Sequence, residues 1–290
     1  MISLDQQSPA SIANAPISGA AVASAAGPSS TSTSAPPLAS KHVSPRGVQV
    51  WLPPTYDESP SRRFPVLYMH DGQAVFDAAM AGAEWQMDEA AQRMISRGEI
   101  APFIIVAVDN TERRFDEYTP TRARLPSERI AAGREAVMGG GAPAYAKFLV
   151  EELKPEIDRR YRTLAAREHT SVGGASLGGL LSLWLALHHA DTFGAALVVS
   201  PSVWWDDRFI LRDVARATIA PTLRAKLWLD MGANETVTAI PNVRLLRAAL
   251  IERGWSDANL RYTEDADGSH DEASWALRVP AMLRYLYPVR

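Results

Sequence analysis

The sequence predicts an α/β protein in which a mostly parallel sheet carries helices on both faces. Short apolar runs alternate along the chain with amphipathic stretches of helical period. Two of these runs, PVLYMH (65–70) and FIIVAV (103–108), are almost wholly apolar, which is typical of strands buried on both faces. Ligand sites in such sheets lie beyond the carboxyl ends of the strands. We therefore expect the functional residues in the loops that follow the strands.

The alternation gives seven strands and five helices. The strands are expected at 47–53, 65–70, 103–108, 169–175, 196–200, 226–231 and 259–264. The helices are expected at 84–98, 142–161, 177–190, 242–254 and 272–287. Two of them, 84–98 and 242–254, end at a glycine, which is a common helix stop. Pro280 lies inside the last helix and predicts a kink or a split there.

The chain divides by composition into a tail and a folded domain. Residues 1–40 consist mostly of Ala, Ser, Pro, Gly and Thr, and they offer too little apolar surface to offset the entropy of ordering them. They are expected to be a disordered tail or linker. Residues 41–290 are expected to form the catalytic domain, and a chain of 290 residues that is 47% apolar can bury a sizeable core.

Composition excludes several classes of function. A net charge of −3 gives no indication of nucleic acid or an anionic membrane surface as a partner. The absence of cysteine excludes disulfides, thiolate catalysis and cysteine-based zinc sites. No run approaches the ~20 apolar residues that span a bilayer. The N-terminus has neither the basic start nor the apolar centre of a signal peptide.

One serine stands among glycines at the end of an expected strand. The stretch GASLG (174–178) matches the G-x-S-x-G elbow and lies between a strand and a helix, which is the context that this motif requires. Ser176 would then lie at a helix N-terminus, where free N–H groups favour developing negative charge. A tight turn without chemistry is the alternative. The motif and its context favour a nucleophile.

A serine nucleophile needs a base, which follows it along the chain in sheet-based hydrolases. Three histidines follow Ser176. His188 and His189 end the helix that Ser176 begins, about 18–20 Å away at ~1.5 Å per residue, and cannot reach it. His270 lies in the polar loop EDADGSHDEASW (264–275) and is the expected general base.

The third member of such a site is an acid that orients the imidazole. Glu235 follows the strand expected at 226–231 and is the favoured candidate. Asp230, within that strand, is an alternative. Asp206 and Asp207, which follow the preceding strand, are further alternatives.

A tetrahedral intermediate also needs an oxyanion hole. The backbone N–H of Leu177, directly after the serine, is one expected donor. The other is expected from the loop HDGQAVFD (70–77), where Gly72 permits a tight turn and Gln73 supplies the N–H. His70 precedes the serine and is expected to support this loop.

Four stretches together carry a family resemblance: LYMHDGQAVFD, GGASLGGLLSLWLALHHADTFGAALVVSPSVWW, LDMGANE and DGSHDEASWALRVP. The chain from about residue 40 to 290 resembles the putative-esterase (esterase D-like) branch of the α/β-hydrolases. This branch includes feruloyl and acetyl-xylan esterases, S-formylglutathione hydrolase and siderophore esterases that cleave enterobactin-type trilactones. The resemblance implies the α/β-hydrolase fold with little or no lid.

The resemblance also implies roles for three residues. Ser176 corresponds to the nucleophile and His270 to the base, while Glu235 stands where feruloyl-esterase-like members often carry aspartate. Some siderophore esterases of this branch are described as using a Ser–His pair without a clear acid. The resemblance therefore implies either a Ser–His–Glu triad or a Ser–His dyad.

Two further stretches lie where substrate would bind. RFDEYTP (114–120) follows the strand expected at 103–108, and its Arg114 and Glu117 either line the cleft or pair with each other. SPSVWW (200–205) ends another strand. Its Trp204 and Trp205 form either an aromatic wall of the cleft or part of the core.

These observations favour a serine carboxylesterase that needs no metal or cofactor and acts on a small-molecule or polymer-linked feruloyl, acetyl or siderophore ester. An acyltransferase of the same fold and a catalytically silent binding module are the alternatives. The family's tendency toward export and the linker-like tail favour a periplasmic or secreted protein, whereas the lack of a signal peptide favours the cytoplasm. The sequence gives no indication of oligomeric state.

Overall fold

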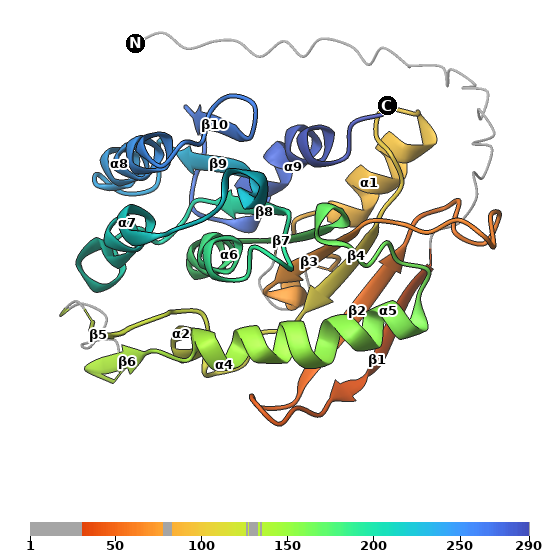
Figure 1. Ribbon diagram of the computed structural model, residues 1–290, viewed down its shortest axis with the longest axis horizontal. Coiled ribbons are helices and arrows are strands. Elements are labelled where there is room, and N and C mark those ends of the chain that lie inside the picture. The colour runs from red at the N-terminus through yellow and green to blue at the C-terminus, as the bar shows by residue number, and fades with distance from the viewer. Residues whose placement is uncertain (1–30, 78–82, 126, 128–132, 134, 290) are drawn as a thin grey trace, which may run out of the picture.

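One eight-stranded sheet runs through the protein (Figure 1). The computed structural model describes residues 31–77, 83–125, 127, 133 and 135–289. The strands of the large sheet follow the order β1-β2-β4-β3-β7-β8-β9-β10, and β5 and β6 form a separate pair. The strands are β1 (Thr31–Leu38), β2 (Arg46–Leu52), β3 (Val66–His70), β4 (Ile104–Val108), β5 (Arg122–Arg124), β6 (Val137–Gly139), β7 (Thr170–Ala175), β8 (Ala195–Val199), β9 (Lys226–Gly232) and β10 (Leu260–Asp265).

The sheet is antiparallel at one edge and parallel elsewhere. β1 and β2 pair antiparallel, as do β2 and β4, and every pairing from β4 through β3, β7, β8 and β9 to β10 is parallel. All seven strands expected from the sequence are present. The carboxyl ends of β3, β7, β8 and β9 therefore lie along one edge, where the loops of interest begin.

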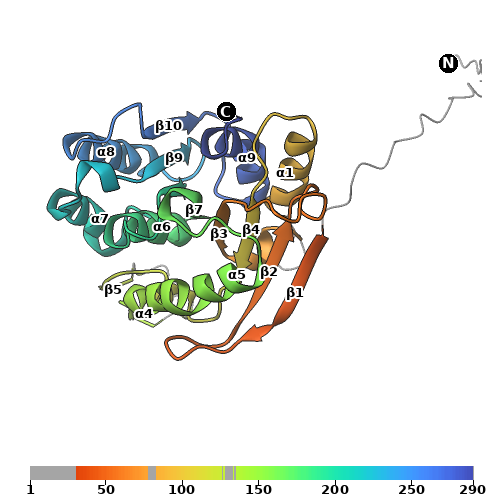
Figure 2. The same cartoon turned by 45° about the vertical axis from the view of Figure 1, so that its right-hand side comes forward.

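Helices cover both faces of the sheet, as Figures 1 and 2 show. The helices are α1 (Met87–Ser96), α2 (Arg114–Glu117), α4 (Ala142–Lys147), the π-helical turn η2 (Phe148–Leu153), α5 (Lys154–Arg160), α6 (Leu177–His188), α7 (Trp205–Arg216), α8 (Ala239–Glu252) and α9 (Glu272–Leu286), with short 3₁₀ turns at η1 (Gly72–Ala74), η3 (Arg167–His169) and η4 (Pro221–Leu223). Buried side chains of α1 and α9 pack on one face, whereas those of α4, α5, α6, α7 and α8 pack on the other.

Alternation along the central strands divides the core into these two layers. In β4, Ile104 and Val106 face the layer of α6 and α8, whereas Ile105 and Ala107 face the layer of α1 and α9. All four side chains are fully buried. A strand covered on both faces has to be apolar at every position, which explains the unbroken apolar runs in the sequence.

The predicted boundary between tail and domain at residue 40 is wrong for residues 31–38, because these residues form β1. Backbone pairing with β2 holds this segment. The composition of a segment indicates how much apolar surface it can bury but not which backbone groups it pairs with, so composition alone did not predict this strand. The register shifts between Ala35 and Leu38, where Pro36 and Pro37 have no N–H to donate, as is typical of an edge strand. Residues 1–30, the rest of the predicted tail, lie outside the described residues.

Several helices differ from the prediction. The short helix α2 was not predicted, and the helix expected at 142–161 contains the π-helical turn η2 between α4 and α5. α9 continues through Pro280 as one helix, so the predicted split does not occur. α7 was not predicted, since its segment was treated as a strand end and loop. In the described part of the chain, no helix combines the length and apolarity needed to cross a bilayer.

Candidate active site

Ser176 occupies a strained turn between β7 and α6. Its backbone has φ 60° and ψ −119°, a conformation that side chains rarely adopt outside such turns. A Cβ added at Gly174 would lie 3.1 Å from the backbone of Gly178 and 3.1 Å from Cβ of His70. The glycines around the serine are therefore required by the close approach of β3, β7 and α6.

The Ser176 hydroxyl lies at the N-terminus of α6. Its Oγ is 3.2 Å from Oγ of Ser202, and the Ser202 N–H donates a 2.9 Å hydrogen bond to the Ser176 carbonyl. Leu177 is the first residue of α6, where the helix itself provides no acceptor for the backbone N–H. A helix N-terminus with free N–H groups favours negative charge placed beside it.

A cavity of about 390 Å³ opens beside the serine. Ser176 and His270 both line it, and so does Gln73, the second expected oxyanion donor. Among the residues that the structure describes, no hydrogen bond joins Ser176 Oγ to the His270 ring. The cavity is lined by Asp71, Gln73, Ala74, Trp85, Asn110, Arg114, Ala175, Ser176, His270, Glu272 and Trp275.

His270 and Glu235 form a direct contact. The Nδ1 atom of His270 is 2.7 Å from Oε2 of Glu235, which is almost fully buried, while the His270 side chain is 42% exposed. The other carboxylate oxygen, Oε1, accepts hydrogen bonds from Ser200 Oγ at 2.5 Å and from the Gly232 N–H at 2.8 Å. Burial alone would raise the pKa of Glu235, but the hydrogen bonds from His270, Ser200 and Gly232 hold this pKa below its usual value.

The alternative acids lie elsewhere. Asp230 is fully buried and accepts hydrogen bonds from Arg278 at 2.8 Å and from the Trp228 indole at 2.7 Å. Asp206 and Asp207 lie at the start of α7 and pair loosely with Arg212, at 3.8 and 3.9 Å. Of the four candidate carboxylates, only that of Glu235 contacts the His270 ring in the described structure.

Two tryptophans form an aromatic wall of the cavity. The rings of Trp85 and Trp275 lie 5.3 Å apart, and Trp275 meets the His270 ring edge-on at 5.2 Å. The Trp275 indole also donates a 3.1 Å hydrogen bond to Ser200 Oγ. Trp275 thus contacts both His270 and the hydroxyl that holds Glu235.

Of the two alternatives for Trp204 and Trp205, the structure shows the core position and not a wall of the cleft. Trp205 is buried, and its indole N–H donates to Thr121 on the opposite side of the sheet from Trp85 and Trp275. Trp204 packs half-buried against the same core layer. Neither residue lines the cavity beside Ser176.

Of the two alternatives for Arg114, the structure shows the position at the cavity, and its ion-pair partner is Asp71 and not Glu117. Its Nε and one terminal nitrogen donate to the two oxygens of Asp71 at 2.6 and 2.8 Å. The Asn110 amide donates a third hydrogen bond to Asp71, and Asn110 also exchanges hydrogen bonds with the Gln73 side chain. This network ties the β3 loop, which carries Gln73, to the loop after β4.

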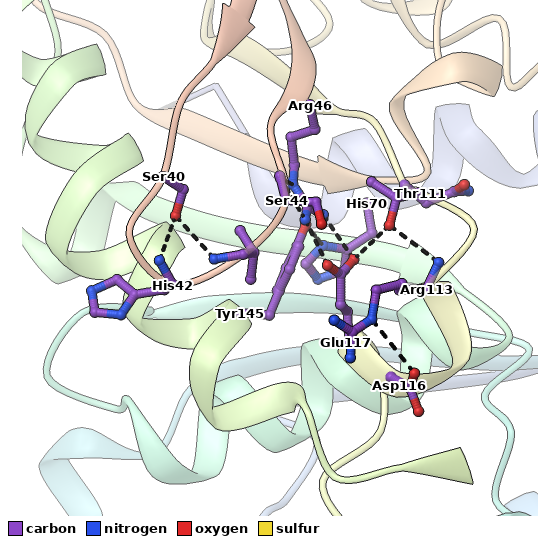
Figure 3. Close-up of polar contacts among 12 residues, drawn as sticks. Ser40, His42, Ser44, Arg46, His70, Thr111, Arg113, Asp116, Glu117 and Tyr145 are labelled. Carbon is purple, nitrogen blue, oxygen red and sulfur yellow. Dashed lines mark hydrogen bonds and ion pairs between the residues drawn. The ribbon is translucent and has the colours of Figure 1, made fainter.

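Glu117, the last residue of α2, is held by hydrogen bonds from Arg46 and Thr111, as Figure 3 shows. The Arg46 guanidinium donates to both Glu117 oxygens, at 2.8 and 3.1 Å, and the Thr111 hydroxyl donates at 3.2 Å. Arg46 and Glu117 are both buried. This buried ion pair fixes the turn from which Arg114 reaches the cavity.

His70 supports the elbow without reaching the cavity. It is buried beneath Gly174 and Gly178 and packs against the rings of Tyr118 and Tyr145. Burial lowers the pKa of His70 to about 3, so the ring is neutral near pH 7. At the far end of α6, His188 pairs with Asp213 at 2.9 Å.

Sequence reasoning missed several cavity residues, namely Asp71, Trp85, Asn110, Glu272 and Trp275. Asp71 directly follows β3, and Asn110 lies two residues after β4. Their positions at the carboxyl ends of neighbouring parallel strands were the available signal.

In the described ranges, no cluster of three or more histidine and carboxylate side chains is arranged to hold a metal ion.

Known proteins that are similar to this chain include siderophore esterases. Ferri-bacillibactin esterase BesA of Bacillus subtilis is 33% identical over 164 residues, which cover 53% of this chain and 53% of that protein. The match therefore spans about half the length of BesA. Siderophore enterobactin esterase of Emericella nidulans is 24% identical over 209 residues, 68% of each chain.

Solved structures show the same fold. A ferulic acid esterase superposes with a TM-score of 0.67 at 19% identity and covers 89% of this chain and 98% of its own. The siderophore hydrolase EstA from Aspergillus nidulans superposes with a TM-score of 0.67 at 20% identity, over 96% of this chain and all of its own. The family model described as Putative esterase matches residues 41–286. The chain therefore belongs to the Putative esterase family and has the α/β-hydrolase fold.

Proposed function

We propose that this protein is a serine carboxylesterase in which Ser176 is the nucleophile, His270 the general base and Glu235 the acid of the triad. The contact that carries the proposal is the 2.7 Å hydrogen bond between His270 and Glu235, at a cavity that Ser176 also lines. The membership of an esterase family supports the same reaction class. The elbow conformation of Ser176 supports its role as nucleophile.

The contacts of Glu235 fix the tautomer of His270. Because Glu235 accepts at Nδ1, the proton of the neutral ring lies on Nδ1, and Nε2 is left as the acceptor. Nε2 takes the Ser176 proton as Oγ attacks the ester carbonyl, and the carboxylate stabilises the imidazolium that results. In the resting site the serine hydroxyl is shared with Ser202, so attack requires it to turn toward His270.

The tetrahedral oxyanion would be held by the backbone N–H groups of Leu177 and Gln73. Leu177 supplies the N–H at the start of α6, and Gln73 is held at the cavity by its hydrogen bonds to Asn110. His270 then protonates the leaving alcohol. In the second half of the cycle it removes a proton from water, which attacks the acyl-enzyme and releases the acid.

We propose a siderophore-type or feruloyl-type ester as the substrate. The curated relatives named above are siderophore esterases, and a ferulic acid esterase shares the fold. The wall formed by Trp85 and Trp275 suits an aromatic ring in either kind of ester. The cavity has an open, mixed polar and aromatic lining, which fits a bulky ester better than a short alkyl chain.

The test is hydrolysis of p-nitrophenyl butyrate, followed by a panel of feruloyl and siderophore esters. Ser176→Ala and His270→Ala are each expected to lower kcat by about 10³-fold or more. Ser171→Ala, which removes a buried hydroxyl within β7, is the matched control and should retain activity. An unchanged rate in Ser176→Ala would refute the proposal. Added alcohol acceptors distinguish hydrolysis from acyl transfer, since a transferase would re-form an ester.

A further inference from the structure

The charges that line the cavity are unequal. Besides His270, the lining contains two acidic side chains, Asp71 and Glu272, and one basic side chain, Arg114. A charge held in a cleft with low-dielectric walls acts on a bound ligand more strongly than one in open solvent. The balance between these three groups therefore bears on which substrates the site accepts.

The positive charge of Arg114 is already compensated. Both of its hydrogen bonds to Asp71 are short, at 2.6 and 2.8 Å, and the two side chains are only 25% and 20% exposed. Burial by itself lowers the pKa of Arg114, but the Asp71 carboxylate holds this pKa above its usual value. A guanidinium whose fork is occupied by a carboxylate offers little attraction to a second anion.

Among the described residues, Glu272 has no hydrogen-bonded partner of this kind, although its charge contributes to raising the pKa of Arg114. It lies in the first turn of α9, two residues after His270, and is partly buried at the cavity wall. Within the described residues it forms no ion pair. After Asp71 and Arg114 cancel, Glu272 leaves the cavity with one net negative charge.

The flank of the cavity beside Trp85 has the same sign. Asp77, Glu84 and Glu89 lie around the start of α1, and Glu84 lines the same hollow as Ala273 of α9. Burial raises the pKa of Glu84, and the charges of Glu89 and Asp77 raise it further, which shows that these carboxylates repel one another. Arg93 is the basic side chain beside Glu84 in the hollow that these residues line, so the flank keeps an acidic excess.

We propose that this site selects esters whose substituents are uncharged or cationic and discriminates against anionic esters, with Glu272 as the specificity-determining residue. The inference rests on the esterase function proposed above. An anionic substituent in the cavity would face an uncompensated carboxylate, whereas a cationic one would pair with it.

Three p-nitrophenyl esters of similar acyl length test this inference. They are p-nitrophenyl pentanoate, which is neutral, mono-p-nitrophenyl glutarate, which is anionic, and p-nitrophenyl 4-(trimethylammonio)butanoate, which is cationic. Each kcat/KM is divided by the rate constant of the same ester with hydroxide, which removes differences in intrinsic reactivity. The wild type should prefer the neutral over the anionic ester by roughly threefold to thirtyfold at low salt, the range set by one charge about 6 Å away. Added NaCl should narrow the gap.

Glu272→Gln should bring the anionic and neutral rates together and should lower the relative rate of the cationic ester. A local distortion of the His270 loop would slow all three esters by the same factor, so the ratios isolate the charge. Glu252→Gln, which removes an exposed carboxylate at the end of α8, is the matched control and should leave the ratios unchanged.

The two proposals fail in different ways. A wild type that cleaves all three esters with equal corrected kcat/KM, or a Glu272→Gln variant with wild-type ratios, overturns the charge selectivity and leaves the esterase function intact. A wild type that cleaves none of the three esters and none of the feruloyl and siderophore esters of the panel refutes the esterase function itself.

Discussion

The Glu235 carboxylate bridges His270 and Ser200. One oxygen lies 2.7 Å from the imidazole Nδ1 of His270, and the other accepts from the Ser200 hydroxyl at 2.5 Å. Ser200 also accepts a hydrogen bond from the Trp275 indole, whose ring packs edge-on against His270. The base, its acid and the hydroxyl behind that acid therefore form one connected unit, in which each contact restricts the orientation of the next.

Glu235→Gln should lower kcat by about 10²- to 10⁴-fold with a smaller effect on KM. The amide keeps the size of the side chain but removes the charge that stabilises the imidazolium. Steady-state kinetics on p-nitrophenyl butyrate give both constants. A variant with wild-type kcat would show that Ser176 and His270 act as a dyad and that Glu235 is dispensable.

Ser200→Ala should lower kcat about tenfold without abolishing folding. The change removes one of the three donors to Glu235, and a hydrogen bond to a charged group contributes about 1.5–3 kcal/mol. In the wild type, the hydrogen bond from Ser200 lowers the pKa of Glu235. Its loss should raise this pKa, so the acid limb of the pH–rate profile should move to higher pH. Ser171→Ala is the control. A fall in activity without any movement of the pH profile would assign Ser200 a purely structural role.

Arg114→Ala should lower the free energy of unfolding by about 2–3 kcal/mol, because it leaves the partly buried Asp71 carboxylate without its partner. Adding Asp71→Asn should recover part of that loss, since no uncompensated charge remains. Urea denaturation of the wild type, both single variants and the double variant measures the coupling. Strictly additive losses would contradict the importance of this pair.

His70 should make the protein less stable in acid. Its pKa is about 3 in the folded protein and about 6.5 when unfolded, so the unfolded chain binds the extra proton first. This contribution to stability is fully present above pH 6.5 and is lost as the pH falls toward 3, by up to about 1.4 kcal/mol per pH unit. Urea titrations at several pH values should show a shallower slope in His70→Phe, whereas equal slopes would rule out this cause.

The sequence predicted the parallel part of the sheet because its central strands β3, β4 and β8 are mostly apolar and are followed by polar loops. It missed β1 because that strand is held by backbone hydrogen bonds, which composition does not predict. It missed α7 because the segment opens with aromatic and acidic residues that resemble a loop, and its buried Ile210 and Val214 give only a short apolar stripe.

Pairings between distant residues were the hardest part of the site to predict. Chain order indicated His270 as the base and Glu235 as its acid, but Asp230, Asp206 and Asp207 remained alternative acids. The structure shows that Asp230 pairs with Arg278 instead of His270. Arg114 was expected either at the cleft or paired with Glu117, whereas its actual partner Asp71 lies 43 residues away and no local pattern links the two. Trp204 and Trp205 follow a strand end, as cleft residues do, but the turn after Ser200 directs them into the core.

Covalent labelling tests directly whether Ser176 is the nucleophile. The protein is treated with ethyl p-nitrophenyl butylphosphonate, a neutral phosphonate diester that traps serine esterases, and the modified peptide is sequenced by tandem mass spectrometry. We expect one adduct per chain, located on Ser176 and not on its neighbour Ser202. Labelling should be much slower in His270→Ala. An adduct on another serine, or no adduct while the esters are still cleaved, would contradict the assignment of Ser176 as the nucleophile.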